Sequence, residues 1–185
     1  MARMLLLLLT ALVLAFAGCG ADEGGGGGSG DAVDVRTWAE SVCGSAREWV
    51  DETEARSEVF QTGEPLTSLE EARAMMVDVL DGVAADGAEA VAEIEAAGTP
   101  DVEQGEEARD AFVGVVERNV DEVRARRDEF EQLDPNDPQF QSDYEAIFNR
   151  MGERMGFDEA FEEEVDPEVN ETFDEVEDCR TLRDL

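Results

Sequence analysis

Cysteine is the most reactive side chain type in this chain. Neither lysine nor histidine, the other common nucleophiles and bases, occurs among its 185 residues. Their absence excludes a P-loop lysine, a Schiff-base lysine, histidine-based catalytic triads and histidine metal ligands. The cysteines are Cys19, Cys43 and Cys179, and no two of them have the Cys-x-x-Cys spacing of redox or zinc sites. We therefore predict no catalytic residue, no metal site and no cofactor, and we expect a protein that is not an enzyme.

Cys19 follows a segment that has the features of a secretory signal peptide. One positive side chain, Arg3, precedes an uncharged apolar run from Met4 to Phe16. This run is shorter than the ~20 residues that a membrane-spanning helix requires. Small residues at 17 and 18 then lead directly to Cys19.

The sequence Phe16-Ala17-Gly18-Cys19 resembles the lipobox of bacterial lipoproteins, a family that usually has leucine at the position of Phe16. The resemblance implies that residues 1–18 are removed and that Cys19 carries a lipid as the new N-terminus. Cleavage by an ordinary signal peptidase and an uncleaved anchor are the two alternatives. The expected location is extracytoplasmic, with the lipid holding the protein to the cell membrane.

A glycine-rich segment separates Cys19 from the rest of the chain. Residues 24–30 read Gly-Gly-Gly-Gly-Gly-Ser-Gly, a composition typical of flexible tethers. We therefore divide the chain into a signal peptide (1–18), a lipidated N-terminus with its tether (19–30) and a folded domain (31–185).

The two remaining cysteines, Cys43 and Cys179, lie near opposite ends of the predicted domain. In a secreted chain such a pair favours a disulfide, which would connect the first helix to the last. Two separate buried thiols are the alternative.

Apolar residues recur at helical spacing through most of residues 31–185, and no sustained strict alternation interrupts them. Residues at this spacing form an apolar stripe along one face of each predicted helix. The stripes, in chain order, are Val35, Trp38, Val42, Ala46, Trp49 and Phe60; then Leu69, Ala72, Met76, Leu80, Val83, Ala90 and Ile94; then Ala108, Phe112, Val116, Val123, Phe130 and Leu133; then Phe140, Tyr144, Ile147, Phe148, Met151 and Met155; and finally Val169, Phe173 and Val176.

Turn and capping residues separate these stripes. Ser68 or Thr67 with an acid three residues later predicts a capping box, and Asp137-Pro138 and Asp166-Pro167 predict helix starts. Antiparallel helices with short connections form up-down bundles. The predicted fold is all-α, an up-down bundle of about four long helices plus a short C-terminal helix.

Three polar residues within or beside the stripes are candidate site residues. Asn119 lies in the third stripe, where it would contact a ligand or set the helix register, or be a satisfied core amide. Arg56 and Arg126 lie at stripe edges, where each would bind an anion or pair with nearby acids. Methionines and phenylalanines in the stripes would line an adaptable pocket or simply form core; those considered are Met75, Met76, Phe148, Met151 and Met155.

The formal charge of −34 argues against nucleic-acid binding, because phosphates require basic partners. Trp38-Ala39-Glu40-Ser41-Val42-Cys43-Gly44, with the lipobox, the tether and Cys179, resembles the layout of small helical lipoproteins of high-GC Gram-positive bacteria. That group is mostly uncharacterised, so the resemblance implies a membrane-tethered helical domain and no catalytic residues. We expect a non-enzymatic, acidic module that binds an unknown envelope component; a carrier or sensor of a hydrophobic small molecule is the alternative.

Overall fold

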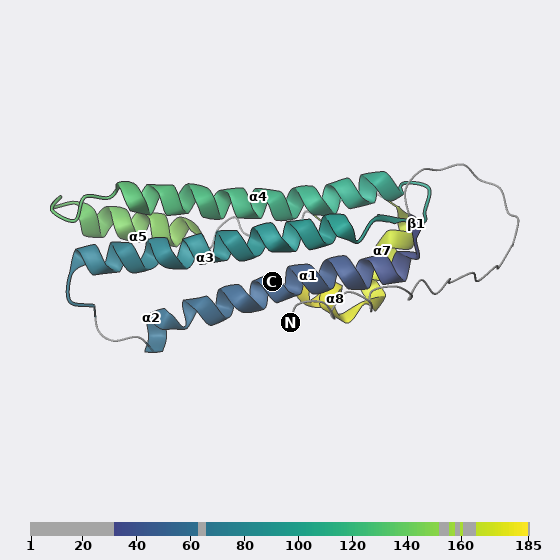
Figure 1. Ribbon diagram of the computed structural model, residues 1–185, viewed down its shortest axis with the longest axis horizontal. Helices are drawn as coiled ribbons and strands as arrows, with labels where there is room; N and C mark the ends of the chain where they lie inside the picture. Colours follow the sequence, from purple (N-terminus) through teal and green to yellow (C-terminus); the bar gives the residue numbers. More distant parts are fainter. Residues whose placement is uncertain (1–31, 63–65, 152–155, 158–159, 161–165, 185) are drawn as a thin grey trace, which may run out of the picture.

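The computed structural model describes residues 32–62, 66–151, 156–157, 160 and 166–184. These residues form an all-α protein in which long helices pack up and down (Figure 1). The three long helices are α1 (Val35–Ser57), α3 (Leu69–Ala96) and α4 (Gly105–Gln132), and a single turn, α2 (Val59–Thr62), follows α1. The predicted fold class is confirmed.

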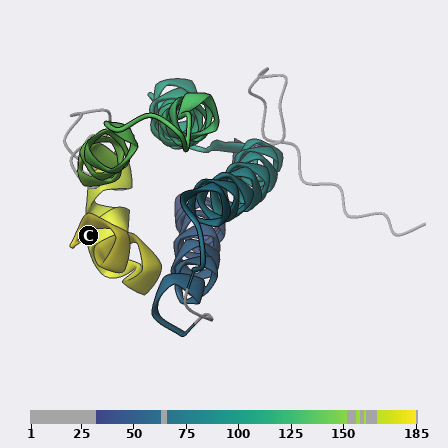
Figure 2. The same cartoon turned by 90° about the vertical axis from the view of Figure 1, so that its left-hand side faces the viewer.

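Shorter helices complete the bundle on its remaining side. They are α5 (Phe140–Met151), α7 (Pro167–Glu175) and α8 (Glu177–Arg183). Figure 1 shows α5 beside one half of α4, and α8 lies along α1 near its middle. In the end view of Figure 2, α4, α3 and α1 form an arc, and α5, α7 and α8 lie on its open side.

The core follows the predicted helical periodicity. Both tryptophans and the central residues of the α3 and α4 stripes are buried. Gly87 of α3 allows close helix approach, because a Cβ there would lie 2.6 Å from Val120 and 2.8 Å from the Trp49 ring. The indole nitrogen of Trp49 donates a hydrogen bond of 2.9 Å to the carbonyl of Val83, which connects α1 to α3.

Side-chain hydrogen bonds cap the N-termini of the helices. Ser68 accepts from the Glu71 N–H, and the Glu71 carboxylate accepts from the Thr67 N–H and hydroxyl, which confirms the capping box. Asp166 caps α7 by accepting from Glu168, with Pro167 in the first turn. At the other end of α3, Gly98 has φ 82°, a left-handed conformation that glycine adopts without strain.

Three element boundaries differ from the prediction. The first helix is interrupted after Ser57, the fourth begins at Phe140 rather than Pro138, and the last is divided into two at Val176. Val176 has an extended backbone (ψ 126°), so α8 changes direction relative to α7, and Cys179 lies against α1. The apolar period continues through such breaks, which is why the sequence pattern alone does not reveal them.

A short pairing of extended segments was not predicted. Strand β1 (Ala32–Val33) pairs in parallel with β2 (Thr99–Pro100), in the connection between α3 and α4. The carbonyl of Val33 also accepts from the Asp101 N–H at 2.8 Å. The start of the described chain is therefore held at the end of the bundle opposite α2 (Figure 1).

Candidate functional site

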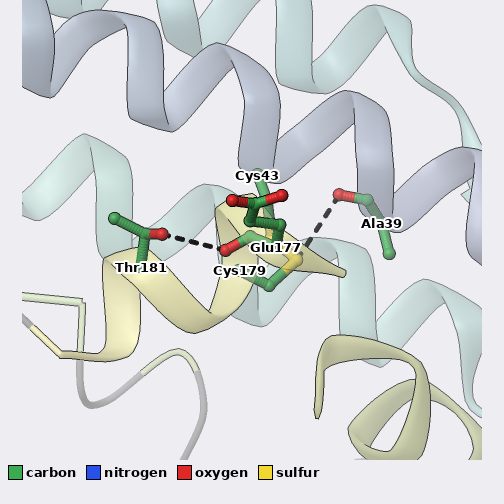
Figure 3. Close-up of a disulfide and its surroundings, with 5 residues drawn as sticks. All are labelled: Ala39, Cys43, Glu177, Cys179 and Thr181. Atoms are coloured by element: carbon green, nitrogen blue, oxygen red, sulfur yellow. Dashed lines mark hydrogen bonds between the residues drawn. A yellow bond between two sulfur atoms is a disulfide. The ribbon is translucent and has the colours of Figure 1, made fainter. Parts of the chain in front are cut away.

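Cys43 of α1 and Cys179 of α8 form a disulfide, with Cα atoms 5.1 Å apart and 136 residues between them in sequence (Figure 3). Both cysteines are fully buried. The sulfur of Cys179 lies 3.6 Å from the carbonyl oxygen of Ala39, and Thr181 donates a hydrogen bond to the Glu177 carbonyl within α8. The bond joins the first and last helices as predicted, and its burial indicates a structural role rather than thiol chemistry.

Aromatic packing reinforces the same junction. The rings of Trp38 and Phe173 lie 5.8 Å apart between centroids, and Phe112 lies 5.9 Å from Phe173. These three side chains come from α1, α7 and α4 and are almost completely buried. The C-terminal helices are thus attached to the bundle by both a covalent bond and apolar contacts.

Asn119, the polar residue in the α4 stripe, is only 6% exposed. Its side-chain amide donates a 3.1 Å hydrogen bond to the carbonyl of Gly156, in the chain beyond α5. One residue further, Phe157 packs edge-on against Trp49 of α1. Asn119 of α4 and Trp49 of α1 therefore hold Gly156 and Phe157 against the bundle.

Arg56 pairs with an acid of a neighbouring helix. Its Nε and Nη2 both donate to the carboxylate of Asp86 on α3, the latter at 2.8 Å, and this pair raises the pKa of the guanidinium. The guanidinium lies over Gly82, where a Cβ would be 2.5 Å from Nη1. This arrangement connects α1 to α3 and leaves Arg56 already neutralised by an acid.

Arg126 is also enclosed by acids. Its side chain is 11% exposed and pairs with Glu122 and, at 2.6 Å, with Glu129, although its Nε has no partner among the described residues. Glu129 also binds Arg150 of α5 at 2.5 Å. The cluster joins α4 to α5, and its two acids balance its two arginines.

The methionines and phenylalanines of the proposed pocket do not share one environment. Met76 is buried in the core, Met75 and Met151 are partly buried, and Met155 lies outside the described residues. The expectation that Phe148 belongs to the core stripe is wrong, because its side chain is 49% exposed. On the same helix, Phe140 and Ile147 are buried, so the exposed Phe148 side chain lies outside the buried part of the α5 stripe.

Four further apolar residues are exposed in α2, before α3 and in the first turn of α3. Two of them, Phe60 and Leu69, were predicted to belong to the core stripes, and this prediction is wrong. Phe60 lies in α2 and Leu69 is the first residue of α3, and among the described residues no helix buries either side chain. We call this group the hydrophobic tip: Val59, Phe60, Leu66 and Leu69, with exposed fractions of 37%, 39%, 47% and 46%.

The sequence around the residues of the hydrophobic tip is acidic. Residues 51–72 contain seven acids and a single basic residue, Arg56, which Asp86 neutralises. Glu54, Glu58 and Glu70 are exposed, and hydrogen bonds from Thr67 lower the pKa of Glu71, so this carboxylate is charged at neutral pH. The exposed apolar residues therefore belong to an acidic stretch of the chain.

Cys19, the residue predicted to carry the lipid, lies outside the described residues. Within the described ranges, no cluster of three or more cysteine, aspartate or glutamate side chains is arranged to hold a metal ion, and no helix has the length and hydropathy to cross a membrane. Comparison of the chain with known protein families, characterised proteins and solved structures found no match.

Proposed function

We propose that this protein is an extracytoplasmic lipoprotein whose acidic helical bundle acts as a non-enzymatic interaction module of the cell envelope. The lipobox-like residues ending at Cys19 and the glycine-rich segment that follows them support the anchored location. The Cys43–Cys179 disulfide agrees with an oxidising compartment. The resemblance in layout to small helical lipoproteins of high-GC Gram-positive bacteria supports the same assignment.

The observation that carries the interaction role is the hydrophobic tip. Four large apolar side chains are exposed within eleven consecutive residues of a chain whose formal charge is −34. Exposed apolar groups with a polar border are characteristic of protein interaction sites. The candidate polar residues, in contrast, bind other parts of the bundle: Arg56 binds Asp86, and Asn119 binds Gly156.

Anchoring in this proposal depends on the lipid rather than on charge. A bundle with this excess of acids is repelled by anionic headgroups, so electrostatic adhesion is excluded. Each buried CH₂ of an acyl chain contributes ~0.8 kcal/mol, and stable attachment requires more than one chain. A diacylglyceryl group on the sulfur of Cys19 supplies two chains and meets this requirement.

Detergent phase partition of the Cys19→Ser variant tests the anchor. We expect the unsubstituted chain to enter the detergent phase and Cys19→Ser to remain in the aqueous phase. The matched control is Cys43→Ala/Cys179→Ala, which removes the other two sulfurs and leaves partition unchanged. Entry of Cys19→Ser into the detergent phase would contradict lipidation, as would an intact mass without fatty chains.

A further inference from the structure

The two halves of α1 are attached to the bundle in different ways. All buried residues of this helix lie between Trp38 and Trp49. This half carries the disulfide to α8, and the Trp49 indole donates its hydrogen bond to the Val83 carbonyl of α3. From Val50 to Ser57, a range that the structure describes in full, no side chain is buried. The core therefore holds the first half of α1 and not the second.

The partly buried face of the second half is polar. Thr53 and Ser57 follow Trp49 along this face, each about one helical turn beyond the last. Their hydroxyls donate hydrogen bonds of 2.8 Å to the carbonyls of Trp49 and Thr53, which belong to α1 itself. Such bonds connect no second helix, and they often bend the helix that contains them. Figure 1 shows α1 and α3 moving apart toward α2, in agreement with a face that adds no apolar contact.

A single arginine connects the second half of α1 to α3. Arg56 binds the Asp86 carboxylate through both Nε and Nη2, and its guanidinium lies over Gly82 of the same helix. The hydrogen bond with Asp86 is the main reason that the pKa of the Arg56 guanidinium is raised. The negative charges of Glu52 on α1 and Asp78 on α3 act on it in the same direction. One cation thus interacts with three carboxylates from two helices.

Loss of this cation would do more than remove an ion pair. Arg56 is the only basic residue between Val50 and Thr62, so without it the three carboxylates would have no cation beside them on α1. A partly exposed ion pair contributes little by itself, but its removal here also leaves like charges to repel one another across α1 and α3. A released segment of this length would not stay helical, because isolated helices shorter than ~12–15 residues are marginal in water.

We propose that Val50–Thr62, which we call the distal arm, opens and unwinds independently of the rest of the bundle, with Arg56 as the latch that closes it on α3. Trp49 is the fixed end of the arm, and the disulfide keeps the first half of α1 in place while the arm opens. The exposed side chains of Val59 and Phe60 belong to the arm and move with it. This order–disorder device depends neither on the lipid anchor nor on a binding partner.

Hydrogen–deuterium exchange of the full chain in detergent micelles, followed by mass spectrometry, tests the distal arm. Peptides that cover residues 52–60 are compared with peptides that cover residues 36–48 of the same helix. In the unsubstituted protein we expect the amides of 52–60 to exchange at least about tenfold faster, because they open without global unfolding. Equal protection of the two halves would overturn the proposal.

A matched pair of variants tests the latch. Arg56→Gln should speed exchange of residues 52–60 by a further threefold to tenfold, as a rough estimate, and leave residues 36–48 unchanged. The control is Arg127→Gln, which removes the same charge from an arginine that reaches Asp81 of α3 from α4. It should leave residues 52–60 unchanged. Equal effects of the two variants on the distal arm, or faster exchange of 36–48 in Arg56→Gln, would overturn the proposal.

Two further measurements distinguish the latch from an ordinary ion pair. Asp86→Asn should open the distal arm less than Arg56→Gln, because it removes an acid and leaves Arg56 with Glu52 and Asp78. Raising NaCl from about 50 to about 500 mM should slow exchange of 52–60 in Arg56→Gln, since salt screens the remaining carboxylates. Arg56→Lys, which keeps the charge without the paired hydrogen bonds, should lie between the wild type and Arg56→Gln. An Asp86→Asn effect as large as that of Arg56→Gln, or no slowing by salt, would refute the latch.

Discussion

Gly87 shows how one small residue determines helix spacing. A Cβ at this position would lie 2.6 Å from a Val120 methyl and 2.8 Å from the Trp49 ring, both within the core. Val120 and Trp49 have no room to move, because each is packed among buried side chains. The glycine therefore sets the distance of α3 from both α1 and α4.

We predict that Gly87→Ala lowers the free energy of unfolding by about 1–3 kcal/mol, because the added methyl forces the core apart. Gly44 is the matched control, since a Cβ there has no atom within 4 Å. Gly44→Ala should instead stabilise the protein by about 0.5–1 kcal/mol through helix propensity. Urea denaturation followed by circular dichroism measures both changes, and stabilisation by Gly87→Ala would contradict the described packing.

Asn119 provides a second prediction at this scale. Removing its amide in Asn119→Ala leaves the Gly156 carbonyl without this donor, which should cost about 1–3 kcal/mol of folding stability. Asn149→Ala, at an exposed position of α5, serves as the control and should change stability by less than about 0.5 kcal/mol. Comparable losses from the two variants would show that the hydrogen bond to Gly156 is unimportant.

At the scale of elements, the helix starts depend on carboxylates. Hydrogen bonds from Thr67 to Glu71, and from Thr37 to Asp34, lower the pKa of each acid. A carboxylate whose pKa is lower in the folded state stabilises that state above its unfolded pKa, and the contribution is lost as the pH falls through the folded value. The starts of α1 and α3 are therefore sensitive to acid.

Accordingly, Glu71→Ala should destabilise the protein more at pH 7 than at pH 3, because the stabilisation by the wild-type carboxylate falls as acidification protonates it. Equilibrium unfolding at both pH values measures the difference between variant and wild type. Glu70→Ala is the control, because Glu70 lies exposed on the same turn without the Thr67 hydrogen bonds. A destabilisation by Glu71→Ala that is the same at both pH values would contradict the capping role.

At the scale of the whole molecule, the disulfide determines how the chain closes. It connects α1 to α8 across 136 residues, and the chain-entropy model assigns roughly 5 kcal/mol to a loop of this length. The aromatic contacts among Trp38, Phe112 and Phe173 lie at the same junction. Loss of the bond should therefore weaken the attachment of α7 and α8 first.

Cys43→Ala/Cys179→Ala should lower the free energy of unfolding by about 2–5 kcal/mol. Adding a reductant under denaturing conditions should shift the unfolding midpoint of the wild type toward that of the double variant. The same reductant should leave the double variant unchanged. Identical midpoints for oxidised wild type and double variant would show that apolar packing alone holds the C-terminal helices.

Much of this architecture could be predicted from the sequence because its signals are local. Helical period, the Ser68–Glu71 box and the Asp166-Pro167 start each depend on residues a few positions apart. The pairing of Cys43 with Cys179 could be predicted because the lipobox-like sequence before Cys19 assigns that cysteine another role and leaves two. The breaks after Ser57 and at Val176 lacked such signals, because the apolar spacing carries on across them.

Tertiary structure alone decided which apolar residues are covered and which charges meet. Phe60, Leu69 and Phe148 fit the helical stripes, yet all three side chains are exposed. The pairing of Arg56 with Asp86 and of Asn119 with Gly156 brings together residues 30 and 37 positions apart. Burial and long-range pairing depend on how helices are placed in space, and a periodic sequence specifies the face of a helix but not the neighbour that covers it.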